Sequence, residues 1–314
     1  MALRPALVVF ACAAAGLAQM PARAQVPAAP PAGASLAVPN AAGVSMGHLH
    51  YRVRDVAANR RFWIALGGQP VPPGHKRFAA PGREILRFQD VLVVLDPGDT
   101  TGGTEGSVVN HVAFRIPSLA PVEAAGLTAA RLAQFPGVSS VMSPENERVE
   151  LFENTATNLT FVPDGGARDA AAERHNRALA VPIAFHHIHL YVADAAAATA
   201  AKAWYARVFG GVPGKRAQYD ATDMPGINLN FSAAPRPGGR SSDLPVAKTV
   251  PTKGRMLDHI GFEVVRLREF CRRLEGLGVV FDEHYTEGPD GVGRASLTDP
   301  WGTSIELTEG LAGL

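Results

Sequence analysis

Two sets of residues are suited to binding a metal ion, because three short patterns recur in the same order along the chain. In each half of the chain, a pair of histidines begins a stretch of alternating residue types. A single histidine begins a second stretch, and a glutamate lies in a third. The first set is His48, His111 and Glu150, and the second is His187, His259 and Glu306. Two imidazoles and one carboxylate suit a divalent ion such as Fe²⁺, Mn²⁺, Zn²⁺ or Ni²⁺.

A further histidine accompanies the first member of each set. His50 and His189 follow His48 and His187 by two residues. Residues two apart on a strand face the same side, so we expect these imidazoles to enter the same cavity as the metal. An imidazole near a metal but not bound to it suits general acid or base catalysis. We therefore predict His50 and His189 as catalytic residues, with a cavity-lining role as the alternative.

The predicted ligands are separated by tens of residues, which excludes a local finger-type site and requires assembly by folding. Strand side chains alternate between faces, so imidazoles from two strands and a carboxylate from a third can meet on one concave surface. We expect each set to assemble within its own half of the chain. An alternative alignment of the first half takes residues 154–161 as the last strand, which puts Thr160 at the acidic position instead of Glu150.

Internal repetition also organises the secondary structure. Each half of the chain is predicted to contain two modules, and each module consists of a strand, a helix and three further strands. Helices are predicted where apolar residues recur at helical spacing, and glycine pairs end two of them. The predicted helices cover residues 55–66, 119–133, 195–209 and 267–278.

The domain boundaries follow from composition. Residues 25–43 are rich in alanine and proline and lack periodicity, and residues 164–183 are polar and rich in alanine, which indicates connecting segments. The predicted organisation is a signal peptide at 1–24, a linker at 25–43, a first lobe at 44–163, a connector at 164–183 and a second lobe at 184–314.

The N-terminus is typical of a secretory signal. Arg4 precedes an apolar run at 6–18 that is too short to span a bilayer, and small residues at 22–24 suit cleavage after Ala24. We expect an exported protein, periplasmic or secreted, without a membrane span in its mature chain; an uncleaved anchor is the alternative. Cys271 is then the single cysteine left, and we expect it to be a small buried group.

The amino-acid composition limits the classes of molecule that the protein is expected to bind. Hydrophobic residues make up 46% of the chain and charged residues 19%, with a formal net charge of +1. This balance indicates a globular protein with a substantial core, and the absence of a basic stripe argues against nucleic acid. No phosphate-binding loop, dinucleotide motif or serine-hydrolase elbow occurs. We expect a small-molecule substrate and either a monomer or a homodimer.

The stretches "HIHLYV", "LDHIGFEV" and "DPWGTSIELTE" give the chain a resemblance to the vicinal oxygen chelate superfamily, which includes glyoxalases, bleomycin-resistance proteins and extradiol dioxygenases. The resemblance covers residues 44–312. It implies an α+β fold of four βαβββ modules, paired into two open, barrel-like mixed sheets around a divalent metal. The metal ligands it implies are His187, His259 and Glu306, with His48, His111 and Glu150 in the first half.

The resemblance leaves the reaction open. Glyoxalase I has a fourth ligand, a glutamate, on the last strand of its first module, and "VLVVLDP" and "INLNFSA" have none at that place. Extradiol dioxygenases have a tyrosine shortly before "DP", where this chain has Leu297 and Thr298. Our hypothesis is an exported metal-dependent enzyme for a small substrate with vicinal oxygens, with dioxygenase-like or glyoxalase/isomerase-like chemistry. The alternatives are a ligand-sequestering protein without catalysis, and a protein with one active and one structural lobe.

Overall fold

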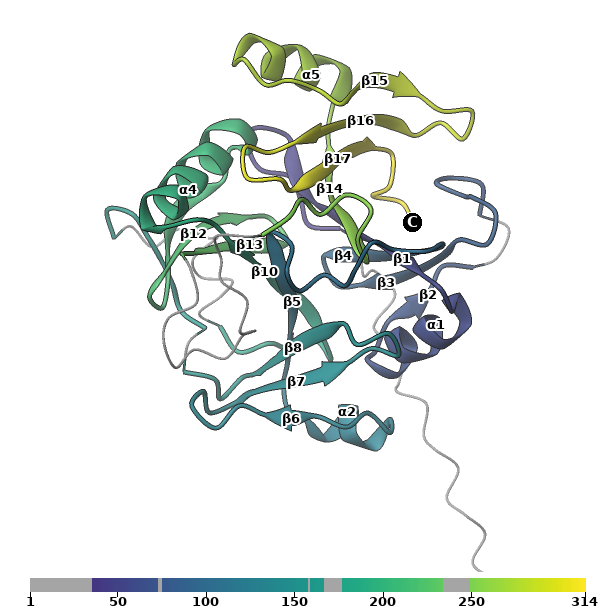
Figure 1. The fold of residues 1–314 in the computed structure, drawn as a ribbon, viewed down its shortest axis with the longest axis vertical. Coiled ribbons are helices and arrows are strands. Elements are labelled where there is room, and N and C mark those ends of the chain that lie inside the picture. Colours follow the sequence, from purple (N-terminus) through teal and green to yellow (C-terminus); the bar gives the residue numbers. More distant parts are fainter. Residues whose placement is uncertain (1–35, 73–74, 158, 167–176, 234–248) are drawn as a thin grey trace, which may run out of the picture.

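Two mixed β-sheets form the framework of the computed structural model (Figure 1). The described residues are 36–72, 75–157, 159–166, 177–233 and 249–314. The predicted signal peptide lies outside them, as do the first part of the linker and the middle of the connector.

Sheet A has eight strands and sheet B has nine. Sheet A has the order β15-β16-β17-β14-β1-β4-β3-β2, and sheet B has the order β6-β7-β8-β5-β10-β13-β12-β11-β9. The strands of sheet A are β1 (Val44–Val53), β2 (Gln69–Pro70), β3 (Glu84–Phe88), β4 (Val91–Pro97), β14 (Leu257–Val264), β15 (Glu283–Glu287), β16 (Gly293–Thr298) and β17 (Ser304–Glu309). Those of sheet B are β5 (Val109–Ile116), β6 (Ala130–Arg131), β7 (Val138–Met142), β8 (Arg148–Glu153), β9 (Phe161–Pro163), β10 (Ala184–Tyr191), β11 (Val212–Arg216), β12 (Tyr219–Met224) and β13 (Ile227–Ser232).

The sheets do not follow the two halves of the chain. In sheet A the first module pairs with the fourth, through antiparallel contact of β1 with β14. In sheet B the second module pairs with the third, through antiparallel contact of β5 with β10. The four modules and the two open sheets agree with the predicted fold class. The expectation that each half of the chain builds its own site is wrong, because each sheet takes strands from both halves.

Helices pack where the repeats predict them. Asp55 and Asp194 cap α1 (Val56–Ala65) and α4 (Ala195–Phe209), each accepting a hydrogen bond from the backbone nitrogen three residues on. Gly210, in the left-handed conformation, ends α4. The helix α5 (Leu267–Gly276) buries Cys271, as expected. None of the helices described is long and apolar enough to cross a membrane.

One predicted helix is much shorter than expected. Instead of residues 119–133, helix α2 spans only Ala120–Ala124. Pro121 fits the first turn, but Gly126 then takes a left-handed conformation and Ala130 enters the short strand β6. Alanine-rich composition favoured a longer helix than this glycine allows.

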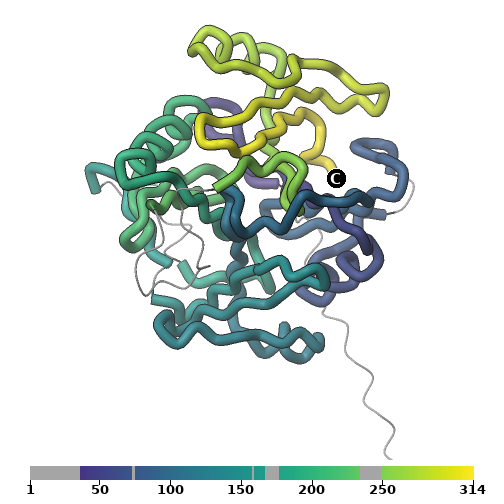
Figure 2. The backbone as a smooth tube through the Cα atoms, viewed as in Figure 1, coloured from purple at the N-terminus to yellow at the C-terminus, as the bar shows by residue number. Residues whose placement is uncertain are grey.

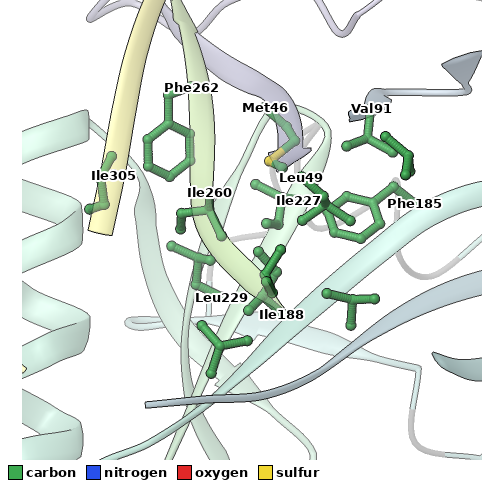
Figure 3. Close-up of a cluster of buried hydrophobic side chains, with 14 of the residues drawn as sticks. Met46, Leu49, Val91, Phe185, Ile188, Ile227, Leu229, Ile260, Phe262 and Ile305 are labelled. Atoms are coloured by element: carbon green, nitrogen blue, oxygen red, sulfur yellow. The ribbon is translucent and has the colours of Figure 1, made fainter. Parts of the chain in front are cut away.

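Alternation along the central strands separates an apolar face from a histidine face. The side chains of Leu49, Ile188 and Ile260 are fully buried in the cluster drawn in Figure 3, which draws side chains from both sheets. Their neighbours along the strands are the histidines. Trp63 and Phe209 join this core from α1 and α4, with rings against Phe114 and Phe262. Burial of this shared core therefore fixes which faces of the sheets carry the polar residues. The continuous backbone trace in Figure 2 shows the same interleaving of early and late segments.

A buried hydrogen bond ties α4 to the turn between β16 and β17. The Tyr205 hydroxyl donates to Asp299 Oδ2 at 2.7 Å, and both side chains are buried. Asp299 Oδ1 accepts from the backbone of Trp301 and Thr303, which shapes the turn before β17. The bond therefore connects a helix of the third module to the strand that carries Glu306.

We expect Tyr205→Phe to lower the free energy of unfolding by about 1–3 kcal/mol, because a buried Asp299 oxygen loses its donor. Urea denaturation measures the change. Tyr285→Phe is the control, since that half-buried ring lies on the edge strand β15 and should change stability by less than about 0.5 kcal/mol. Equal stability of Tyr205→Phe and the wild type would contradict the structural role of the bond.

Candidate functional site

Site A, which comprises His48, His50, His259 and Glu306, lies on three adjacent strands of sheet A. Their candidate ligand atoms all lie within 4.8 Å of one another. The strand register explains this arrangement: His50 faces His259 across β1 and β14, and His48 faces Gly261, which in turn lies beside Glu306. Neighbouring register positions share a face of the sheet, so these side chains converge on one point.

The spacing of the donor atoms in site A fits a metal ion. His48 Nε2 lies 3.0 Å from Glu306 Oε2, and His259 Nε2 lies 3.4 Å from the same oxygen. Both nitrogens are buried and lack a hydrogen-bond partner with acceptable geometry among the described residues. Ligands about 2.1 Å from an ion and at right angles lie about 3 Å apart. Each nitrogen therefore lies about as far from Glu306 Oε2 as cis ligands around one ion lie from one another.

Buried carboxylates orient the imidazoles and set their charge. Burial alone would lower the pKa of His259, but the adjacent carboxylates of Asp258 and Glu306 raise it to about 9. His259 Nδ1 lies 2.7 Å from Asp258 Oδ1, which leaves Nε2 directed at Glu306. Burial lowers the pKa of His48, which has only one carboxylate beside it. The pKa of Glu306 is held well below its usual range, because the adjacent imidazoles of His259 and His48 outweigh its burial.

His50 is held by a different carboxylate. Its Nε2 lies 2.9 Å from Asp96 Oδ2, and its Nδ1 is buried without a partner among the described residues. Arg83 donates to both oxygens of Asp96, at 2.6 and 2.7 Å. Burial, together with the neighbouring His259, lowers the pKa of His50 to about 4. The imidazole is therefore neutral, with its Nε2–H fixed by Asp96 and a lone pair available at Nδ1.

Site B, which comprises His111, His187, His189 and Glu150, occupies the matching place in sheet B. His189 faces His111 across β10 and β5, and His187 faces Ala113, which lies beside Glu150. The three imidazoles lie within 4.8 Å of one another, and His111 Nε2 lies 3.1 Å from Glu150 Oε2. All four side chains are buried.

Two arginines enter site B, whereas in the described part of the chain no arginine directly contacts the histidines of site A. Arg216, which is almost fully buried, places Nη2 3.3 Å from His187 Nε2, and Arg148 places Nη2 2.9 Å from His111 Nδ1. Burial lowers the pKa of Arg216 to about 10, so it remains charged at neutral pH. An ion bound to His187 would lie within about 5 Å of this guanidinium, where the repulsion is about 6 kcal/mol at an effective dielectric constant of about 20. The guanidinium of Arg216 therefore opposes binding of a divalent cation at His187 Nε2, a contact that site A does not have among the described residues.

One glycine also distinguishes the sites. A Cβ at Gly261 would lie 2.0 Å from His48 Cε1, so the imidazole of His48 can reach Glu306 only because this residue has no side chain. Ala113 holds the equivalent position in sheet B. In sheet B, His187 Nδ1 lies 2.9 Å from His186 Nδ1, and His187 Nε2 contacts Arg216. The group of side chains there that could hold a metal ion consists of three histidines and does not include Glu150.

The structure therefore regroups the predicted ligands. His187 does not share a site with His259 and Glu306; His48 takes its place, and His187 lies with His111 and Glu150. The alternative with Thr160 as the acidic position is excluded, because β8 carries Glu150 beside β5 whereas β9 pairs with β11. His50 and His189 do enter the same clusters as their neighbours, as predicted.

Sequence reasoning missed the residues that distinguish the sites. Asp96 was overlooked because "DP" resembles the end of a strand, yet its carboxylate holds His50. Asp258 immediately precedes His259, and such an acidic neighbour was a usable signal. Arg148 lies two residues before Glu150 and was equally readable. Arg216, in a short charged stretch, carried no signal that it would be buried.

Comparison with known proteins agrees with the fold. Residues 184–307 match the model of the Glyoxalase/Bleomycin resistance protein/Dioxygenase superfamily. Glyoxalase I from Zea mays superposes with a TM-score of 0.54 at 14% identity, covering 85% of this chain and 92% of that one. A candidate dioxygenase from Bacillus subtilis gives 0.52 at 13% identity, covering 88% and 86%. A search of curated proteins gave no significant match.

Residues 184–307 thus resemble the Glyoxalase/Bleomycin resistance protein/Dioxygenase superfamily, and the described chain shares the two-sheet fold of these solved structures. At these identities the solved structures show the fold alone. The chemistry has to be argued from the two sites.

We expect Gly261→Ala to abolish metal binding at site A, because the added methyl occupies the space of the His48 ring. Metal content of the purified variant, measured by elemental analysis, tests this. Ala113→Gly, the converse change at the matching place in sheet B, is the control and should leave metal content unchanged. Normal metal content in Gly261→Ala would show that His48 is not a ligand.

Proposed function

We propose that site A binds one divalent metal ion and that the protein is a metal-dependent enzyme acting on a small substrate with two adjacent oxygen atoms. The observation that carries this proposal is the convergence of His48 Nε2, His259 Nε2 and Glu306 Oε2 at ligand spacing, with both nitrogens buried and unsatisfied. Such a buried set costs free energy unless a cation completes it.

The charge of the surroundings supports the same conclusion. Glu306, Asp258 and Asp96 place three carboxylates in or next to site A, and Arg83 is the cation that neutralises one of them. With neutral imidazoles, the described residues leave an excess of two negative charges. A divalent cation would neutralise this excess, and it would displace the proton that His259 otherwise carries.

In this proposal His48, His259 and Glu306 would hold the ion, which would supply Lewis-acid chemistry for the vicinal oxygens of the substrate. Asp258 orients His259 through Nδ1 and directs its other nitrogen inward. His50 acts as a general base, because Asp96 fixes its tautomer and its Nδ1 is available to accept a proton. Such a pair serves isomerisation or ring-cleaving chemistry equally well.

A sequestering protein without catalysis is the competing function. It has no use for an Asp96–His50 pair braced by Arg83, and this braced pair favours an enzyme. The proposal also retains export through the signal pattern at 1–24, which N-terminal sequencing of protein recovered outside the cytoplasm would test.

We expect His259→Ala to lose the bound metal, because two of the three ligands cannot hold the ion alone. Elemental analysis of protein expressed and purified without chelators measures this. His284→Ala is the control, since that exposed imidazole pairs with Glu275 on the surface, away from site A. Equal metal content in the wild type and His259→Ala would remove the proposed site.

We expect His50→Asn to keep the metal and to lower kcat by about 10²–10⁴-fold, the usual contribution of a general base. Catechols and the thiol adducts of 2-oxoaldehydes are the substrates to test first. Loss of metal from His50→Asn would reassign His50 as a ligand. If the His50→Asn variant converts a substrate at the wild-type rate, His50 has no catalytic role in that reaction.

A further inference from the structure

The side chains of site A are exposed on one side only. Those of His259 and Glu306 are 17% and 18% exposed, whereas those of His48 and His50 are 0% and 7% exposed. A ligand therefore reaches the site from the side of His259 and Glu306. On the side of His48 and His50, other residues of the chain cover the imidazoles.

Phe78, which lies between β2 and β3, is an aromatic residue that covers this second side. Its ring centre lies 5.1 Å from that of His48 and 6.3 Å from that of His50, and the residue is only 1% exposed. Leu92 and Val94, the register partners of the two histidines on β4, belong to the same apolar cluster as Phe78. Phe78 thus forms an apolar wall over the histidine face of sheet A.

The backbone of Phe78 is held in place by two side chains. Its N–H donates to Asp290 Oδ2 at 2.8 Å, and its carbonyl accepts from Arg83 Nη1 at 2.9 Å. The guanidinium carbons of Arg83 and Arg294 lie 4.6 and 5.2 Å from the centre of the ring. Phe78 has a φ of 59°, a left-handed conformation that a bulky residue keeps only where its surroundings fix it.

Arg83 also connects this wall to the proposed general base. The guanidinium that donates to the carbonyl of Phe78 donates to both oxygens of Asp96, and Asp96 in turn holds His50. The ring of Phe78 and the imidazole of His50 therefore keep a fixed relation to each other. The space left in front of His50 depends on the size of the residue at position 78.

We propose that Phe78 determines the specificity of site A, because it limits the size of the substrate group that faces His48 and His50. This inference rests on the function proposed for site A. Two hydrogen bonds fix the backbone of Phe78, so a bulky group on that side of the substrate would overlap the ring, and such overpacking is costly. A small group such as hydrogen or methyl avoids the overlap, and the larger part of the substrate extends toward the exposed side of His259 and Glu306.

Isothermal titration calorimetry of the metal-loaded protein tests the proposal with two hydroxamate probes, each of which presents two adjacent oxygen atoms. N-methylacetohydroxamate carries a methyl group beside each oxygen, and N-phenylbenzohydroxamate carries a phenyl group beside each. A probe bound in either direction therefore places one substituent against Phe78. We expect Phe78→Gly to strengthen binding of the phenyl probe by about tenfold or more, and that of the methyl probe by less than about threefold. Glycine removes the ring and adopts a positive φ without strain.

Phe135→Ala is the matched control, because that half-buried phenylalanine packs against a separate apolar cluster that includes residues of sheet B. This variant should bind both probes as the wild type does. If Phe78→Gly does not fold, Phe78→Leu decides the outcome. Leucine keeps an apolar but shorter side chain, so we expect a smaller gain in affinity, and for the phenyl probe alone.

Unchanged affinity for the phenyl probe in the Phe78 variants, or an equal gain for both probes, would overturn the role of Phe78. Bound metal and binding of the methyl probe would then leave the function proposed for site A standing. Elemental analysis of the same samples separates the two failures, because wild-type protein without metal would remove site A and this inference together.

Discussion

The antiparallel pairing of β1 with β14 is the contact on which site A depends. It joins strands more than two hundred residues apart and places His50 opposite His259 and His48 opposite Gly261. A slip of one residue would turn the imidazoles of one strand to the opposite face. The apolar residues that alternate with the histidines prevent such a slip, because Leu49 and Ile260 must stay in the shared core. The hydrophobic core thus sets the geometry of the polar site.

Charge compensation then gives the two related sites different roles. Both carry histidines and a glutamate at equivalent register positions, which explains why the sequence repeats. Site A adds the carboxylates of Asp96 and Asp258, and site B adds Arg148 and Arg216. Buried charges are costly unless they are paired, so the carboxylate excess of site A favours a cation there.

The sequence predicted the modules, most helices and every residue of the two clusters, because alternation and capping are local signals. It could not predict which modules share a sheet. The patterns around His48 and His187 are nearly the same, so either could pair with the strand of His259, and only the packing of the whole chain selects His48. The burial of Arg216 could not be predicted from the sequence either, since a charged residue on a strand is normally exposed. Gly261 became informative only once its distance to His48 was known.

The most direct test of the central claim is anomalous diffraction from crystals of the zinc-loaded protein at the zinc absorption edge. We predict one strong peak per chain, bounded by His48 Nε2, His259 Nε2 and a Glu306 carboxylate oxygen. A peak located among His111, His187 and His189, or the absence of any peak beside Glu306, would contradict the account.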